Sequence, residues 1–392
     1  MSFGAVRSWP AFSRQDVFRF FLLGAALSLP SVVHGASVST ALYGTSRDGR
    51  EVEQVTLRGD SGMTVKLISY GAAVTDVVVP DRRGRMTNVV LGYGGFADYE
   101  RYMRRNYFGA TVGRYAGRIA GARFSILGKT YRLEPNDGAN ALHGGAPPGL
   151  ESKVWKVRPL RAGKIVGAVF SYTSPDGEQG FPGRLSVEVT YRLEPGNALR
   201  IDYRARTTKP TVLNLTNHSY FNLAGAGSGS VAAQTLRIFA ARWVADAGGI
   251  PTGAFPTVAG TPLDFRTATA IGLRADVHTP PMGERGGYNH AWLLDGKATG
   301  VPRVAAELED PGSGRRLTVS TTEPSLVVYT GDYFSGEDVG AQGVIYHRRD
   351  GVALETQHLS DSPNHPDFPT TLLRPGQIFR SSTIWRFSTD RG

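Results

Sequence analysis

The chain has 392 residues, 41% of them hydrophobic and 20% charged, a balance typical of a globular protein and not of a disordered one. It contains no cysteine, which excludes disulfides, thiolate metal sites and a cysteine nucleophile. The formal net charge of +10 is spread over single basic residues and pairs such as Arg82–Arg83. We therefore interpret it as a solvated surface and expect no nucleic-acid partner.

Residues 1–36 have the organisation of a secretory signal peptide. Arg14 and Arg19 precede an apolar stretch at 20–33, and small residues follow it. The stretch is too short for a comfortable membrane span. We expect cleavage near residue 36, a mature chain of residues 37–392 that is periplasmic or secreted, and no stable membrane insertion after cleavage. An uncleaved N-terminal anchor is the alternative.

Alternation of apolar and polar residues predicts strands from about residue 50 to the end of the chain. In chain order, these predicted strands cover residues 63–69, 72–79, 123–127, 129–133, 186–193, 198–204, 316–320, 325–329 and 383–387. One segment, 96–106, indicates a helix because Tyr99, Tyr102 and Met103 have helix-compatible spacing. No linker divides the body. The sequence predicts an all-β protein with one large sandwich domain over residues 37–392.

Two residues are candidates for proton transfer. Glu355 lies in a predicted strand, and burial there would raise its pKa and make it a better base near neutrality. His218 lies among polar and aromatic residues and can titrate in the working range of an enzyme. The sequence pattern is also compatible with a salt-bridged Glu355 and with a structural His218.

Three further residues are candidates for ligand contacts. His143 precedes two glycines, which permit a close backbone approach in a pocket or in a simple turn. Arg118 and Asp264 are residue types that bind vicinal hydroxyls, although each also occurs in ordinary ion pairs and turns.

Several kinds of chemistry lack a sequence signal. The eight histidines are scattered and form no HxxxH or HExxH arrangement, so we expect no metal. No phosphate loop, dinucleotide fingerprint or GxSxG elbow is present, so we expect no nucleotide cofactor and no serine-hydrolase chemistry.

Taken together, six segments between residues 42 and 390 resemble the aldose 1-epimerase (galactose mutarotase) family. They read GRYAGRIAGARF, NALHGG, TNHSYFNLAG, TPLDFR, GYNHAW and ALETQHLSDSPNHPDFPTTLLRPG, in that order. The resemblance implies a large antiparallel β-sandwich, an aldose monosaccharide as substrate and no cofactor. It also implies the site residues: Glu355 as general base, His218 as general acid, and Arg118, His143 and Asp264 as sugar contacts. We expect a monomer or a homodimer.

The chain departs from the family pattern at positions near these motifs. Gly117 stands where the pattern usually has Asn, Val327 where it has Gln, Asp332 where it has Asn, and Asn289 where it has Asp. Lost amide groups remove hydrogen bonds that would select particular hydroxyls. The sequence therefore leaves the preferred sugar open.

Two other readings remain at this stage. One is a carbohydrate-binding protein on the same scaffold without catalysis, motivated by Gly117 and Val327. The other is a related sugar enzyme, either a phosphosugar epimerase, which needs arginines for its phosphate, or a glycoside hydrolase, which needs two carboxylates. Glu355 is the one convincing carboxylate, which disfavours the hydrolase.

Overall fold

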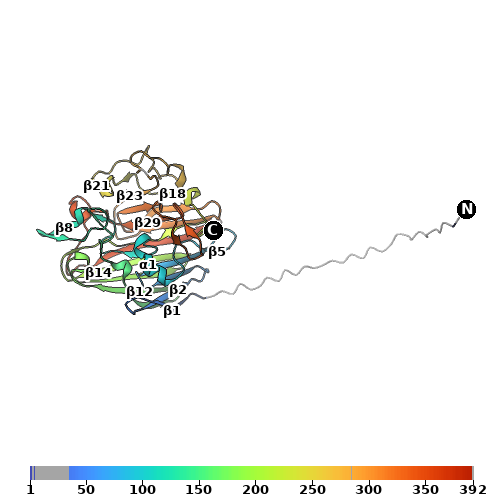
Figure 1. Cartoon of the computed structure of the whole chain (residues 1–392), viewed down its shortest axis with the longest axis horizontal. Helices are drawn as coiled ribbons and strands as arrows, with labels where there is room; N and C mark the ends of the chain where they lie inside the picture. Colours follow the sequence, from blue (N-terminus) through green and yellow to red (C-terminus); the bar gives the residue numbers. More distant parts are fainter. Residues whose placement is uncertain (2–3, 5–34, 284, 391–392) are drawn as a thin grey trace. The chain divides into compact units, whose positions relative to one another are not determined.

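The computed structural model describes residues 1, 4, 35–283 and 285–390 (Figure 1). The described residues from Gly35 onward belong to one compact unit. The signal peptide expected over residues 1–36 lies, apart from residues 1, 4, 35 and 36, outside the described residues. No helix in the described part of the chain is long and apolar enough to cross a membrane.

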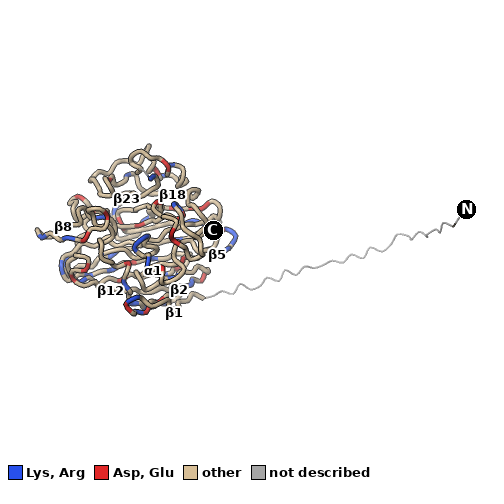
Figure 2. Tube along the Cα trace, in the orientation of Figure 1, with Lys and Arg blue, Asp and Glu red and all other residues tan. Residues whose placement is uncertain are grey.

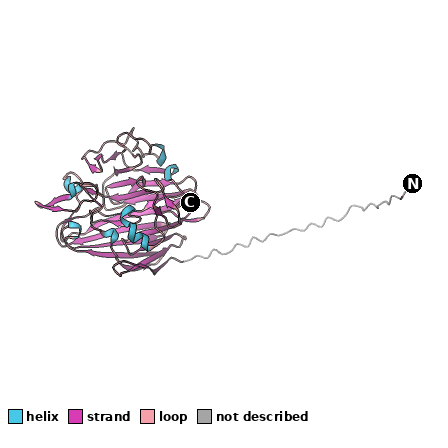
Figure 3. Ribbon diagram, in the orientation of Figure 1, coloured by secondary structure: helices cyan, strands magenta, loops and turns pink. Residues whose placement is uncertain are grey.

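Antiparallel strands dominate the described residues and form three large sheets (Figure 3). The first has the order β1 (Ser37–Thr45), β2 (Glu51–Arg58), β3 (Thr64–Ile68), β4 (Ala73–Pro80), β5 (Met86–Asn88). The second has the order β11 (Lys156–Ala162), β12 (Ile165–Ser174), β13 (Leu185–Glu194), β14 (Ala198–Thr207), β31 (Phe379–Thr389), β25 (Arg315–Thr321), β24 (Arg303–Glu309), β18 (Thr235–Ile238), β22 (Thr269–Ala270). The third has the order β17 (Tyr220–Phe221), β29 (Val352–Gln357), β26 (Ser325–Tyr329), β23 (Asn289–Leu293), β19 (Arg242–Trp243).

Short two-stranded ladders connect and edge these sheets. They are β6 (Thr111–Val112) with β16 (Thr216–Asn217), β7 (Arg118–Ile119) with β10 (Ala141–Leu142), β8 (Arg123–Ile126) with β9 (Lys129–Arg132), β15 (Thr211–Val212) with β30 (Leu372–Leu373), β20 (Asp246–Ala247) with β21 (Ile250–Pro251), and β27 (Asp338–Val339) with β28 (Ile345–Tyr346). Single 3₁₀ turns lie at Ala120–Ala122, Leu150–Ser152, Glu178–Gly180, Val231–Ala233, Ile271–Leu273 and Ser362–Asn364.

The all-β antiparallel prediction is confirmed, and the predicted strands coincide with observed ones within a few residues. The helix α1 spans Phe96–Asn106, the predicted range. Alternation missed inner strands such as β12 and β24 as well as the edge strands β1 and β11, whose residues are largely exposed or half-buried. An edge strand with little burial carries no period-2 pattern, because both of its faces are partly solvated.

The main hydrophobic core joins the three sheets. Alternate residues supply it, such as Val55 from β2, Val189 from β13 and Leu354 from β29. Phe221 of β17 packs edge-to-face on Trp385 of β31, with ring centroids 4.9 Å apart. The third sheet therefore turns one face to this core, and the side chains on its other face do not belong to it.

Helix α1 covers part of that other face. Its buried residues Phe96, Tyr99 and Met103 recur at helical spacing and pack in a second cluster that includes Ala353 of β29. The helix ends at Asn106, and the next residue, Tyr107, is left-handed (φ 56°) and donates its N–H to the Met103 carbonyl. Gly109 follows at φ +68°, and a Cβ there would lie 1.8 Å from the Val74 carbonyl oxygen, so only glycine fits this turn.

Basic residues are interleaved with acidic ones along the described chain (Figure 2). On the nine-stranded sheet, Arg200 pairs with Asp202 at 2.9 Å, and Arg204 pairs with Glu188 at 3.2 Å. This pairing agrees with a diffuse solvated charge and with the absence of a nucleic-acid motif in the sequence.

Candidate active site

Glu355 owes its position to β29, whose six residues are all buried. Val352 and Leu354 point into the main core, so Ala353, Glu355 and Gln357 point to the opposite face. The Glu355 side chain is only 3% exposed, and its Oε2 atom is buried without a hydrogen-bond partner among the described residues. A buried carboxyl with one unpaired oxygen can exchange a proton with a ligand.

His218 lies between β16 and β17, held by its backbone to the turn after α1. Its N–H donates to the Ala110 carbonyl, and its own carbonyl accepts from Gly109 N–H. Asn217 strengthens the junction by donating its side-chain amide to the Gly109 carbonyl at 2.7 Å. The imidazole Nε2 thereby lies 3.5 Å from Oε1 of Glu355.

Tyr107 orients two histidines at once. Its ring stacks on His218 with centroids 5.6 Å apart and meets His143 edge-on at 4.8 Å. The His143 Nδ1 atom accepts a hydrogen bond from Gly117 N–H at 3.2 Å, so a neutral His143 carries its proton on Nε2. Burial, and then the nearby His218 and Arg118, hold the pKa of His143 well below its usual value. His143 is therefore a fixed neutral donor.

Burial shifts the two central groups in opposite directions. It raises the pKa of Glu355 to about 8, against an opposing effect of the Arg118 charge. It lowers the pKa of His218 to about 4. Without a ligand at pH 7, the one proton of this pair therefore lies on the Glu355 carboxyl. His218 does not titrate near neutrality, contrary to the sequence-based expectation.

Arg118 connects the buried pair to a large cavity. Its Nε atom lies 2.7 Å from an Asp137 oxygen, and both side chains line a cavity of about 930 Å³. Glu355 and His218 do not line that cavity, but the Arg118 charge acts on Glu355. Other polar and aromatic lining residues include Trp243, Asp246, Arg285, Asn289, His290, Tyr329, Asp332 and Tyr333. A polar, aromatic-edged cavity of this kind suits a sugar.

His143, His218 and Glu355 each offer a ligand atom, and these atoms lie within 4.8 Å of one another. Such a set could hold a divalent transition metal only if both histidines presented free lone pairs. The Nδ1 lone pair of His143 is taken by Gly117 N–H, and its Nε2 carries hydrogen. The hydrogen bonding therefore favours proton chemistry over metal binding.

Asp264, expected from the resemblance to contact sugar, does not join this group. Both of its carboxylate oxygens are held by Arg266, at 2.9 Å and 2.7 Å, and that partner lowers its pKa. It is absent from the cavity lining, whereas Asn289 of β23 is present there. The structure thus places Asp264 in an ion pair outside the cavity lining, and its role as a sugar contact stays a prediction.

Asp264→Asn is accordingly expected to leave both kcat and KM within about twofold of wild type, since an ion pair near the surface contributes little. Initial rates of anomer relaxation measured over a range of sugar concentrations give both constants. A tenfold rise in KM would show that Asp264 contacts the sugar.

Sequence reasoning missed Tyr107 and Asp137. Tyr107 follows a predicted helix, and nothing in the local pattern shows that its ring meets histidines 36 and 111 residues away along the chain. Asp137 lies in a turn-rich segment, where acidic residues are common. An ion pair was one interpretation of Arg118 in the sequence, but nothing there identified Asp137 as its partner.

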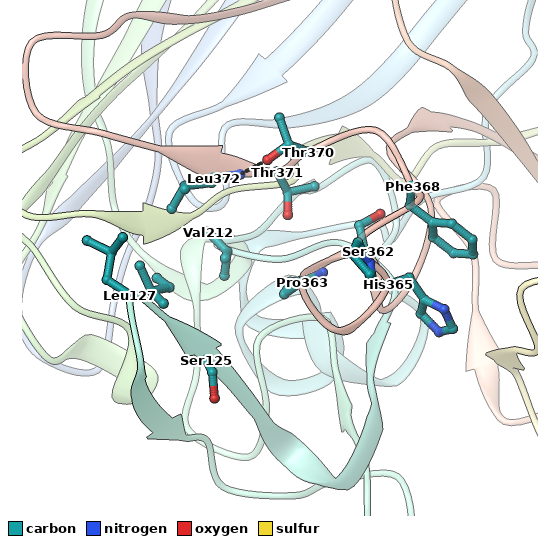
Figure 4. Close-up of a pocket in the computed structure, with 12 residues that line it drawn as sticks. Ser125, Leu127, Val212, Ser362, Pro363, His365, Phe368, Thr370, Thr371 and Leu372 are labelled. Atoms are coloured by element: carbon teal, nitrogen blue, oxygen red, sulfur yellow. Dashed lines mark hydrogen bonds between the residues drawn. The ribbon is translucent and has the colours of Figure 1, made fainter.

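A second pocket, of about 200 Å³, lies between β8 and residues 362–372 (Figure 4). His365 stacks on Phe368 there with ring centroids 4.4 Å apart, and Leu127, Val212 and Leu372 add apolar surface. None of the residues grouped around Glu355 lines it. The chemistry is therefore assigned to the group that contains Glu355, His218, His143 and Arg118.

Known proteins resemble the chain over most of its length. The sequence model of the family described as aldose 1-epimerase matches residues 53–386. A galactose mutarotase from Mus musculus is 40% identical over 356 residues, covering 90% of this chain and 99% of the relative. An aldose 1-epimerase from Escherichia coli K12 is 38% identical over 344 residues, covering 87% and 96% of the two chains.

The fold has solved counterparts. The crystal structure of a galactose 1-epimerase from Lactobacillus acidophilus NCFM superposes with a TM-score of 0.80 at 29% identity, covering 90% of this chain and 99% of that one. A galactose mutarotase-like protein from Clostridium acetobutylicum, at 15% identity and a TM-score of 0.66, shares the fold.

Proposed function

The chain belongs to the aldose 1-epimerase family and is an enzyme that interconverts the α and β anomers of free aldoses, and we propose that Glu355 is its general base and His218 its general acid. The observation that carries these roles is the buried pair itself, with Nε2 and Oε1 3.5 Å apart and one free polar atom on each side chain. Arg118 and His143 hold the sugar.

The reaction opens a hemiacetal and recloses it on the other face of the carbonyl. The proton that rests on Glu355 first moves to His218. In the opening step, ionised Glu355 then takes the proton of the anomeric hydroxyl while protonated His218 gives a proton to the ring oxygen. The C1–O5 bond breaks, and C1 becomes an aldehyde. After rotation about C1–C2, neutral His218 takes the proton back from the hydroxyl at C5, and Glu355 returns its proton to the aldehyde oxygen. No net proton is gained or lost.

Burial favours the ring-opened complex. Opening starts from a charged Glu355–His218 pair and ends with both groups neutral. The surroundings of the pair disfavour charge on either group, as the raised pKa of Glu355 and the lowered pKa of His218 record. The two proton transfers therefore remove two buried charges together, and the dry site favours the open-chain complex over the ring bound to the charged pair. Moving the proton from Glu355 to His218 before opening costs free energy for the same reason.

His143 and Arg118 suit the positioning role for different reasons. The Nε2–H of neutral His143 is a fixed donor, because Tyr107 and Gly117 hold the ring. The Arg118 guanidinium is fixed by Asp137 and presents further donors to hydroxyls. Together they keep C1 in register with the acid and the base.

The other sugar-related readings are not favoured. A binding protein needs no acid–base pair, yet Glu355 and His218 are buried together. A phosphorylated sugar would meet three acidic residues in the cavity, Asp137, Asp246 and Asp332, against the basic Arg118 and Arg285.

Polarimetric relaxation of a freshly dissolved anomer tests the roles, because the double variant Glu355→Gln/His218→Asn should relax free aldoses no faster than buffer does. Faster relaxation of phosphorylated sugars than of free ones by the wild type would favour the phosphosugar epimerase.

We also propose that residues 1–36 are removed on export and that the mature enzyme, residues 37–392, works in the periplasm or outside the cell as a monomer or homodimer. The supporting observation is the order of basic, apolar and small residues at the N-terminus. The intact mass of the protein recovered from the periplasm of a bacterial host should correspond to a start near residue 37, and size-exclusion chromatography gives its assembly. An intact, membrane-bound chain would contradict this proposal.

A further inference from the structure

Gln357 is a buried amide on the same face of β29 as Glu355. It lies two residues further along the strand, so the two side chains point the same way. Its side chain is part of a residue only 2% exposed, and its Oε1 atom is buried with no hydrogen-bond partner among the described residues. Leaving a buried acceptor unpaired destabilises a folded protein, so it calls for a partner that the free chain lacks.

Two other buried amides are hydrogen-bonded at both the oxygen and the nitrogen. Asn214 donates to the Ala116 and His358 carbonyls and accepts from His358 N–H. Gln234 accepts from Leu223 N–H and donates to Asn222. The unpaired oxygen of Gln357 is therefore a local exception beside the proton-transfer pair.

The neighbours of Gln357 explain why its amide stays free. The register partner of Gln357 is Ser325, whose hydroxyl donates to the Gln357 backbone carbonyl at 2.6 Å and not to the amide. The register partner of Glu355 is Val327, which has no polar group. Near the amide nitrogen lies Gly117, where a Cβ would come 3.3 Å from Gln357 Nε2 and 2.5 Å from Ser360 Oγ. That hydroxyl oxygen accepts from Arg118 N–H.

Gly117 also locates the amide within the site. The Gly117 N–H holds the ring of His143, and the next residue is Arg118. The Gln357 amide thus lies close to the segment of Gly117 and Arg118, two residues along the strand from the base. A sugar hydroxyl is a suitable partner, because it both donates and accepts and so satisfies either end of an amide.

Resting on the proposed function, we propose that Gln357 is a specificity-determining residue whose side-chain amide hydrogen-bonds one hydroxyl of the bound aldose. Positions 117 and 327, which usually carry amides in the family pattern, are Gly and Val here. Gln357 is the amide that remains next to the base, and it selects sugars that carry the matching hydroxyl.

Gln357→Leu tests this with a sugar panel. The panel comprises glucose and its 2-, 3-, 4- and 6-deoxy analogues, each followed by polarimetric relaxation and corrected for its own buffer rate. The variant should lose about tenfold in kcat/KM for the parent sugar, the cost of one hydrogen bond. For the one analogue that lacks the partner hydroxyl, wild type and variant should be equal, and that analogue identifies the contact.

Two controls separate contact from structure. Gln234→Leu removes a fully bonded amide and should lower the melting temperature with no dependence on the sugar, whereas Gln357→Leu should leave it unchanged or raise it. If leucine does not pack, the unbranched Gln357→Met gives the same readout. Equal loss on every analogue, or no loss on the parent sugar, would overturn the inference. Wild type failing on every sugar would instead refute the proposed function.

Discussion

Glu355→Gln is expected to slow enzymatic anomer relaxation by about 10⁴-fold, the upper end of what one general base contributes. Glutamine fills the same volume and keeps the hydrogen-bonding shape, but it cannot take the anomeric proton. The substitution also removes a carboxyl whose pKa burial raises to about 8, so no buried charge is lost from the resting site. The variant should therefore fold normally and fail in chemistry.

Polarimetry of a freshly dissolved anomer, run with enough enzyme to detect small residual rates, measures the loss. Glu323→Gln is the matched control, because Glu323 is also buried and contacts a histidine, His358, at 2.6 Å. That control should lose stability, since it weakens the short hydrogen bond to His358, and should retain kcat. If Glu355→Gln keeps more than a tenth of the wild-type kcat, Glu355 is not the base.

The sequence predicts the fold well where burial is one-sided. Strands β13 and β14 alternate cleanly because one face lies in the core and the other is partly exposed, and the pattern therefore shows them. Helix α1 was found at its observed bounds because its buried residues repeat at helical spacing. The edge strand β1 has no difference in burial between its two faces, and the sequence pattern did not predict it.

The site is less accessible to sequence reasoning, because its parts come from distant segments. The sequence left both a buried Glu355 with a raised pKa and a salt-bridged Glu355 open, and in the structure Glu355 is buried with a raised pKa. The depressed pKa of His218 depends on the desolvation that the third sheet, Tyr107 and His143 create together, and no local pattern records it. For Asp264, the sequence motif did not show that its carboxylate is paired with Arg266, two residues away.

His218→Asn is expected to lower kcat by about 10³-fold, because the ring oxygen would leave without a positioned acid. The pH profile gives a sharper signature. In the wild type, kcat/KM should fall above about pH 8, where the pair loses its one proton, and below about pH 4, where it gains a second. Within this range the pair keeps one proton, and the profile should be level.

In His218→Asn the acid is absent, and the remaining activity needs only ionised Glu355. Burial and Arg118 set the pKa of that carboxyl, with no contribution from His218, so it should stay near 8. The residual kcat/KM should therefore rise with pH up to about 8, in the direction opposite to the wild-type alkaline fall. Relaxation rates from pH 5 to 9.5, with circular dichroism to confirm folding, measure this. A residual rate that falls as the pH rises would show that Glu355 does not act as the base and would reverse the assignment of the two residues.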